Sequence, residues 1–145
     1  LGSPRAHQWR SIAQHIEAEG ANGEPVFVQG GLIEARLVPA LFHNPTLMEY
    51  VACRSGRFYL ETPHPRIGLP FVWNDNPDVK GFYHETLATA GRTDTASVWV
   101  AAATDTDLNR QSLSGFLSIA REAGFRISQR RELESASLFR LTYAP

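Results

Sequence analysis

Two stretches of the chain are apolar without polar interruption. One lies in residues 25–31 (Pro-Val-Phe-Val-Gln-Gly-Gly), and the other is Ser97–Ala103. A strand with one solvated face alternates apolar and polar residues, whereas an uninterrupted apolar run is typical of a strand covered on both faces between helix layers. We therefore expect two buried parallel strands that lie side by side in one sheet.

Helical spacing precedes or follows each of these runs. Ser3-Pro4 resembles a helix N-cap followed by proline at the first helical position. Apolar residues then recur at i, i+3, i+4 and i+7, namely Trp9, Ile12, Ala13 and Ile16. A short helix is expected after Asn44-Pro45. Longer helices are expected to begin after residues 74–77 (Asn-Asp-Asn-Pro) and after residues 104–107 (Thr-Asp-Thr-Asp), the last ending at Gly124.

Residues 32–70 give weaker signals, and residues 69–73 are apolar but contain a proline, which limits them to an edge strand. Phe125–Glu132 and residues 137–143 are two strand-like runs joined by a polar turn, a pattern that predicts an antiparallel hairpin. Strands that alternate with helices predict an α/β fold. We expect one domain over residues 1–145, a three-layer αβα Rossmann-like sandwich whose sheet is mostly parallel with a C-terminal antiparallel hairpin.

Composition narrows the classes of function. The fourteen cationic residues, of which only Lys80 is a lysine, are balanced by fifteen carboxylates, and the net charge of -1 argues against nucleic acid as a partner. Cys53 is the only cysteine, which excludes an intrachain disulfide and a cysteine-based zinc site. The chain contains no membrane-spanning window, which needs about 18 apolar residues. It begins with Leu1 rather than Met, and we expect a processed product, a vector remnant or, most simply, a piece of a larger membrane protein.

Polar residues that follow the buried strands are the first candidate binding groups, because ligands of open α/β sheets lie at the carboxyl ends of the strands. The Gln29-Gly30-Gly31 turn could expose backbone N–H groups to a phosphate. It lacks the third glycine of a dinucleotide fingerprint, and Gln29 stands where a methyltransferase-like loop has an acidic residue. A plain tight turn is therefore the favoured interpretation.

Asp105 and Asp107 stand two apart where the second run ends and a helix begins. Paired carboxylates can perform acid/base or metal chemistry. They are also preferred at a helix N-cap and in its first turn, which is the favoured interpretation. The possible ligand-facing edge consists of Gln29, Gly30, Gly31, Glu34, Trp73, Asp105 and Asp107.

Other reactive side chains show no catalytic spacing. The five histidines form no H-x-x-x-H or H-E-x-x-H pattern, and Ser114 lies inside an expected helix rather than at a nucleophile elbow. Cys53 has only Arg54 beside it, which favours an inert buried thiol. Trp73 would suit a sugar face or a membrane interface if exposed, but core packing is favoured. We expect no catalytic residue, no metal and no cofactor.

Three groups of short blocks follow one another along the chain. They are residues 8–13 with Ile16 and 23–24, residues 44–47 with Tyr50 and 57–59, and residues 98–100, 123–125 and 138–141. Each block is loose by itself, and together they cover most of the chain. In their order and spacing they resemble the soluble domain of GT-C type membrane glycosyltransferases, of the dolichyl-phosphate-mannose protein mannosyltransferase-like and aminoarabinose-transferase-like kinds.

This resemblance implies a domain on the extracytoplasmic side, carried after the last transmembrane helix of a protein that uses a polyprenyl-phosphate sugar donor. The family's catalytic acidic residue lies in the membrane portion, and no position here matches it. The implied role is therefore an accessory one, with the membrane-embedded part of the same polypeptide as partner and a glycan or lipid-linked sugar as possible ligand. Two alternatives stay open: a small Rossmann-like transferase binding a nucleotide or S-adenosylmethionine at Gly30 and Gly31, and a protein-interaction module that uses the proline-rich middle and the hairpin edge.

Overall fold

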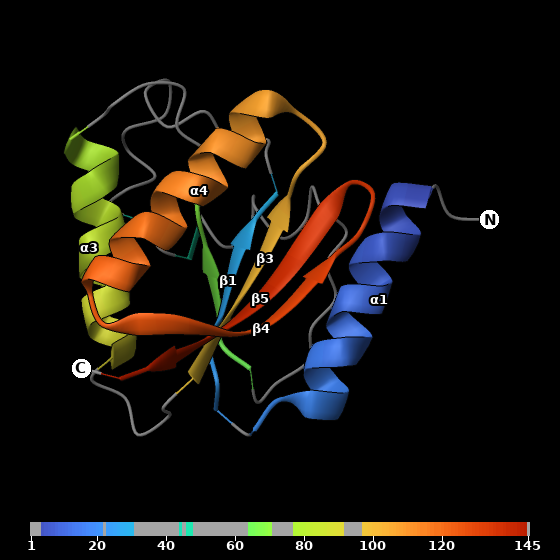
Figure 1. Ribbon diagram of the computed structural model, residues 1–145, viewed down its shortest axis with the longest axis horizontal. Helices are drawn as coiled ribbons and strands as arrows, with labels where there is room; N and C mark the ends of the chain where they lie inside the picture. Colours follow the sequence, from blue (N-terminus) through green and yellow to red (C-terminus); the bar gives the residue numbers. More distant parts are fainter. Residues whose placement is uncertain are drawn as a thin grey trace.

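The computed structural model describes residues 4–21, 23–30, 44, 46–47, 64–70, 77–91 and 97–144. Within these residues it contains three helices and one five-stranded sheet of order β2-β1-β3-β5-β4 (Figure 1). The elements are α1 (Pro4–Glu19), β1 (Val26–Gln29), β2 (Arg66–Gly68), α3 (Pro77–Gly91), β3 (Ser97–Ala103), α4 (Asp107–Glu122), β4 (Phe125–Glu132) and β5 (Ala136–Tyr143).

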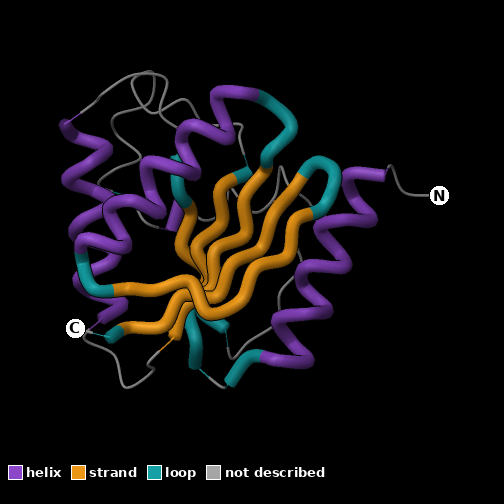
Figure 2. Tube along the Cα trace, viewed as in Figure 1, coloured by secondary structure: helices purple, strands orange, loops and turns teal. Residues whose placement is uncertain are grey.

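Helices cover both faces of the sheet, with α3 and α4 on one side and α1 on the other (Figures 1 and 2). Successive residues of β3 alternate between two cores. Val98, Val100 and Ala102 pack with the α3 and α4 side chains, whereas Trp99 and Ala101 pack with those of α1. Because a strand sends alternate side chains to opposite faces, this double burial explains the uninterrupted apolar run.

The two apolar runs do lie side by side: β1 pairs with β3 in parallel, with Phe27 opposite Val100. The predicted α/β class and the terminal β4–β5 hairpin are likewise confirmed. The edge strand expected at residues 69–73 is instead β2 (Arg66–Gly68), which pairs with β1; residues 71–73 lie outside the described part of the chain.

The prediction of a mostly parallel, Rossmann-like sheet is wrong. β1 has parallel partners on both sides, but β5 pairs antiparallel with β3 along seven positions and antiparallel with β4. The sheet is therefore mixed, with two parallel and two antiparallel pairings. The physical reason is that the returning strand of the hairpin is itself buried and takes the place next to β3, while β4 is left at the edge.

Two local features place α4 beside the hairpin. The side chain of Thr106 accepts a hydrogen bond from the Asn109 backbone N–H at 3.1 Å and caps the start of α4. Gly124 has a φ of 101°, a left-handed conformation that lets the chain leave α4 and enter β4 directly. None of the helices among the described residues has the length and apolar character required to cross a lipid bilayer.

Candidate functional site

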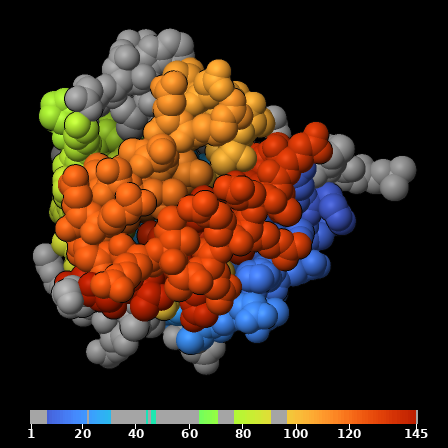
Figure 3. Space-filling model, viewed as in Figure 1, coloured from blue at the N-terminus to red at the C-terminus, as the bar shows by residue number. Residues whose placement is uncertain are grey.

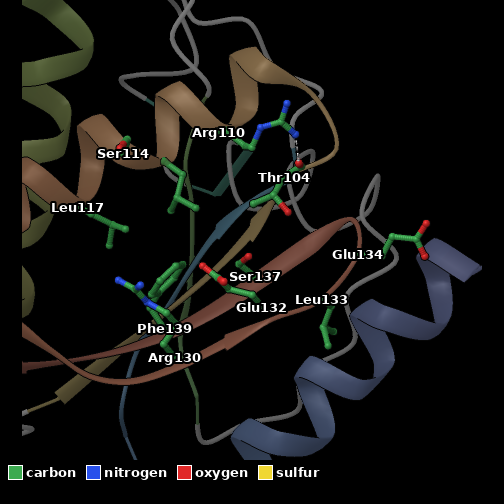
Figure 4. A pocket seen from close by; sticks show the side chains of 11 residues that line it. Thr104, Arg110, Ser114, Leu117, Arg130, Glu132, Leu133, Glu134, Ser137 and Phe139 are labelled. Atoms are coloured by element: carbon green, nitrogen blue, oxygen red, sulfur yellow. Dashed lines mark hydrogen bonds between the residues drawn. The ribbon is translucent and has the colours of Figure 1, made fainter.

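A groove of about 450 Å³ lies between α4 and the β4–β5 hairpin. Figure 3 shows this face of the molecule, with α4 and the hairpin next to each other, and Figure 4 shows the groove at close range. Its lining comes from the end of β3, from one side of α4 and from the hairpin: Thr104, Arg110, Leu113, Ser114, Leu117, Arg130, Glu132, Leu133, Glu134, Ser137 and Phe139.

The apolar part of the groove consists of two leucines of α4, Leu133 of the hairpin turn and Phe139 of β5. Phe139 is only 3% exposed because it belongs to the core on the α3 and α4 side, and the guanidinium of Arg130 lies over its ring, 5.4 Å from the ring centroid. Arg130 and Phe139 stand opposite each other on β4 and β5, so the cation–π contact follows from the strand register. The groove therefore presents the Arg130 guanidinium group beside the ring of Phe139.

Charged groups of both signs border the groove. Arg130 and Glu132 share one face of β4 because they are two residues apart, and Glu134 follows at the hairpin turn (Figure 4). Across from them on α4, Arg110 donates from Nη1 to the Thr104 carbonyl at 2.7 Å and forms an ion pair with Asp107. Arg110 is thus held in place, while Glu132 and Glu134 are exposed.

This lining suits a neutral ligand rich in hydroxyl groups. Carboxylates accept hydrogen bonds, guanidinium groups donate them, and the hydroxyl of Ser114 does both. The lining contains neither histidine nor cysteine, and within the described part of the chain no group of three or more His, Cys, Asp or Glu side chains could hold a metal ion. The arrangement therefore offers hydrogen-bonded recognition of a polar ligand.

Gln29 stands at the carboxyl end of β1, as expected, but its side chain points into the core and is 1% exposed. Its Nε2 donates to the Ser112 Oγ at 2.9 Å and to the Pro70 carbonyl at 3.1 Å, and lies 3.4 Å from the Tyr83 Oη. Its Oε1 is buried without a hydrogen-bond partner. The amide at this predicted edge therefore joins β1 to α3 and α4.

Tyr83 is the second member of this buried polar cluster. Its hydroxyl donates to the Pro70 carbonyl at 2.6 Å and lies 3.3 Å from the Ser112 Oγ. Burial raises the pKa of Tyr83 to about 12, because the phenolate would lose its hydration, and the hydrogen bonds with Ser112 and Gln29 offset only part of this effect. The sequence pattern gave no sign of this polar role for Tyr83.

The other predicted edge residues are not gathered into one site. Asp105 accepts a hydrogen bond from the Asn109 Nδ2 at 3.2 Å, and Asp107 pairs with Arg110 in the first turn of α4. Both carboxylates support the start of α4, although the N-cap residue is Thr106. Gly30 is half-buried. The remaining three, Gly31, Glu34 and Trp73, lie outside the described residues.

A buried charged cluster on the α1 side was also missed. The Glu24 Oε2 pairs with the Arg140 Nη2 at 2.8 Å, and the Glu24 Oε1 accepts from the Trp99 Nε1 at 3.1 Å and from the Ala21 backbone N–H at 2.6 Å. The Arg140 guanidinium also lies 5.1 Å from the centre of the Trp99 ring. These contacts fasten the turn after α1 to β3 and β5, and no sequence spacing indicates partners 116 positions apart.

The groove residues left a weak signal in the sequence. Arg130 and Glu132 have the i, i+2 spacing of one strand face, but only the fold brings them opposite α4.

No protein-family model matches the chain, and no curated protein matches it.

Proposed function

We propose that this chain is an accessory soluble domain of a polytopic membrane glycosyltransferase that uses a polyprenyl-phosphate sugar donor, with catalysis in the membrane portion of the same polypeptide. The proposal rests on which residues carry the resemblance to GT-C type enzymes. Its blocks include Trp9, Trp99 and Phe139, which are buried, and Arg140, which pairs with Glu24. These described members of the blocks thus help to build the fold, which is what an accessory domain shares with its relatives.

The groove between α4 and the hairpin gives this domain a role in holding substrate. Its exposed carboxylates, Glu132 and Glu134, and its held cations, Arg110 and Arg130, can share hydrogen bonds with the hydroxyl groups of a glycan. Because charges of both signs are present, the groove has no strong preference for an anionic ligand. We assign it to the polyol part of the acceptor or of the lipid-linked sugar.

The first test is the gene itself. A reading frame that encodes a polytopic membrane segment together with this chain supports the proposal. A stand-alone cytosolic reading frame contradicts it.

The second test uses the full-length enzyme reconstituted in lipid. We expect the double substitution Glu132→Gln, Glu134→Gln to raise the KM for acceptor about tenfold, the equivalent of about 1.4 kcal/mol, with kcat retained. The double substitution Glu17→Gln, Glu122→Gln is the matched control, since both carboxylates are exposed on helices outside the groove. Loss of kcat in the double variant, with KM unchanged, would show that the groove takes part in the chemistry instead.

The transferase alternative has less support, because the Gln29 amide is used within the core and the sheet is mixed. A thermal-shift screen with nucleotides and S-adenosylmethionine separates the two ideas. Stabilisation at micromolar ligand would favour the transferase, because a ligand that binds only the folded state raises Tm once its concentration exceeds its Kd.

A further inference from the structure

A second cavity, of about 340 Å³, lies on the opposite side of the sheet between α1 and β4. Its lining is His15, Trp99, Gln129, Arg130, Arg131 and Leu138. A β-bulge between Ile127 and Gln129 sets the side chains of β4 here, so that Gln129 stands opposite Arg140 and Arg131 opposite Leu138. Leu138 belongs to the α1 core, and Gln129 and Arg131 contact His15 of α1. The bulge therefore directs both polar side chains to the α1 side.

One tautomer of His15 satisfies both of its polar contacts. The Arg131 Nη1 lies 3.3 Å from the His15 Nδ1, and the His15 Nε2 lies 3.4 Å from the Gln129 Oε1. Because a guanidinium only donates, Nδ1 must accept, and the ring hydrogen is then on Nε2 and points to the amide oxygen. This assignment leaves the Gln129 NH₂ group, a double donor, turned away from the imidazole.

Arg131 is a cation whose hydrogen-bond partners are neutral. Its second contact is the Ser11 Oγ at 3.3 Å, and among the described residues no carboxylate lies within ion-pair distance of it. Arg110 and Arg140, in contrast, each pair with a carboxylate. No Asp or Glu lines the cavity, and its apolar part is Trp99 and Leu138, with the Trp99 indole N–H already donated to Glu24. The cavity thus combines positive charge and spare donors with a low-dielectric wall.

We infer that this cavity is an oxyanion site that takes a phosphate group, carried either by a soluble small molecule or by a lipid headgroup. The Arg131 guanidinium, with N–H groups left over from His15 and Ser11, supplies the charge-assisted hydrogen bonds, and the Gln129 amide supplies further donors. The inference goes beyond the accessory role and does not depend on it: the reading frame tests that role, whereas binding to this chain tests the site.

The soluble arm of the test titrates the chain with inorganic phosphate and with glucose 1-phosphate, followed by amide chemical shifts. We expect saturable shifts in residues of α1 and β4 around the cavity. Arg131→Gln should weaken binding at least about tenfold, because it removes a charge-assisted bond. Arg131→Lys, which keeps the charge and loses the planar fork, should fall in between. Because Arg131 is exposed, we expect both variants to fold like the parent chain. An unchanged Tm checks this.

The control is Arg126→Gln. Arg126 is exposed on the same strand and lies outside this cavity, so the variant makes the same change in net charge without touching the site. The lipid arm measures cosedimentation with phosphatidylcholine vesicles that do or do not contain phosphatidylglycerol.

Binding of the soluble phosphates that depends on Arg131 supports the site and identifies a soluble ligand. Binding only to the anionic vesicles, again dependent on Arg131, supports it and identifies a headgroup. Equal losses in the Arg126 and Arg131 variants, or no binding in either arm, would overturn the inference.

Discussion

Substitution of Tyr83 by phenylalanine tests the buried polar cluster at the end of β1. The variant keeps the ring, which packs against Phe116 with the ring centroids 5.0 Å apart, and removes only the hydroxyl. The Pro70 carbonyl retains its hydrogen bond from the Gln29 Nε2. We therefore expect a loss of about 1 to 2 kcal/mol in the free energy of unfolding at pH 8, the usual cost of one buried hydrogen bond.

The ionisation of Tyr83 also predicts how the free energy of unfolding depends on pH. Burial raises the pKa of Tyr83 to about 12 in the folded chain, whereas a tyrosine in the unfolded chain ionises near pH 10. Between these values the unfolded state binds fewer protons than the folded state, so the free energy of unfolding falls as the pH rises. Ionisation of Tyr83 leaves the free energy of unfolding almost unchanged below about pH 10, lowers it by about 1.4 kcal/mol at pH 11, and lowers it by roughly 2 to 3 kcal/mol above pH 12.

The assay is urea unfolding of the parent chain and of Tyr83→Phe at pH 8 and at pH 11. Other titrating groups are common to both proteins and cancel in the difference between them. That difference should shrink by about 1.4 kcal/mol on going from pH 8 to pH 11. Tyr143→Phe is the control for loss of a tyrosine hydroxyl at a more exposed position, since Tyr143 is 37% exposed. An unchanged difference for Tyr83→Phe would refute the view that Tyr83 is a buried neutral phenol.

Two further substitutions test the contacts that hold the helices to the sheet. Glu24→Gln leaves Arg140 without its carboxylate while keeping an oxygen for the Trp99 N–H, and should lower the free energy of unfolding by about 2 to 4 kcal/mol in urea titrations; the exposed Glu17→Gln on α1 should change it by less than about 0.5 kcal/mol. Thr106→Ala removes the N-cap of α4 and should cost about 1 kcal/mol, with faster amide exchange at Asn109, whereas an unchanged exchange rate there would argue against the cap.

For the candidate site, as for the fold, the sequence predicted local features and did not predict long-range contacts. Sequence reasoning pointed to Gln29 and the two aspartates because they follow buried strands, and the structure shows Gln29 in the core and the aspartates at the start of α4. The groove and the oxyanion cavity depend instead on β4, where Arg130 and Arg131 alternate between the two faces of the sheet. The sequence predicted a strand at Phe125–Glu132, but it did not show which helix would face each of the two arginines.

Hydrophobic patterning by itself determined that Val26–Gln29 and Ser97–Ala103 are buried strands, that helices lie on both sides of them, and that the chain ends in a hairpin. These properties are local, because the spacing of apolar residues reports burial and the period of the backbone. Only the tertiary structure decided that β5 inserts between β3 and β4 and that Glu24 reaches Arg140. Strand direction and long-range pairing depend on which surfaces meet after the chain closes, and the order of apolar and polar residues along a strand is the same for a parallel and an antiparallel neighbour.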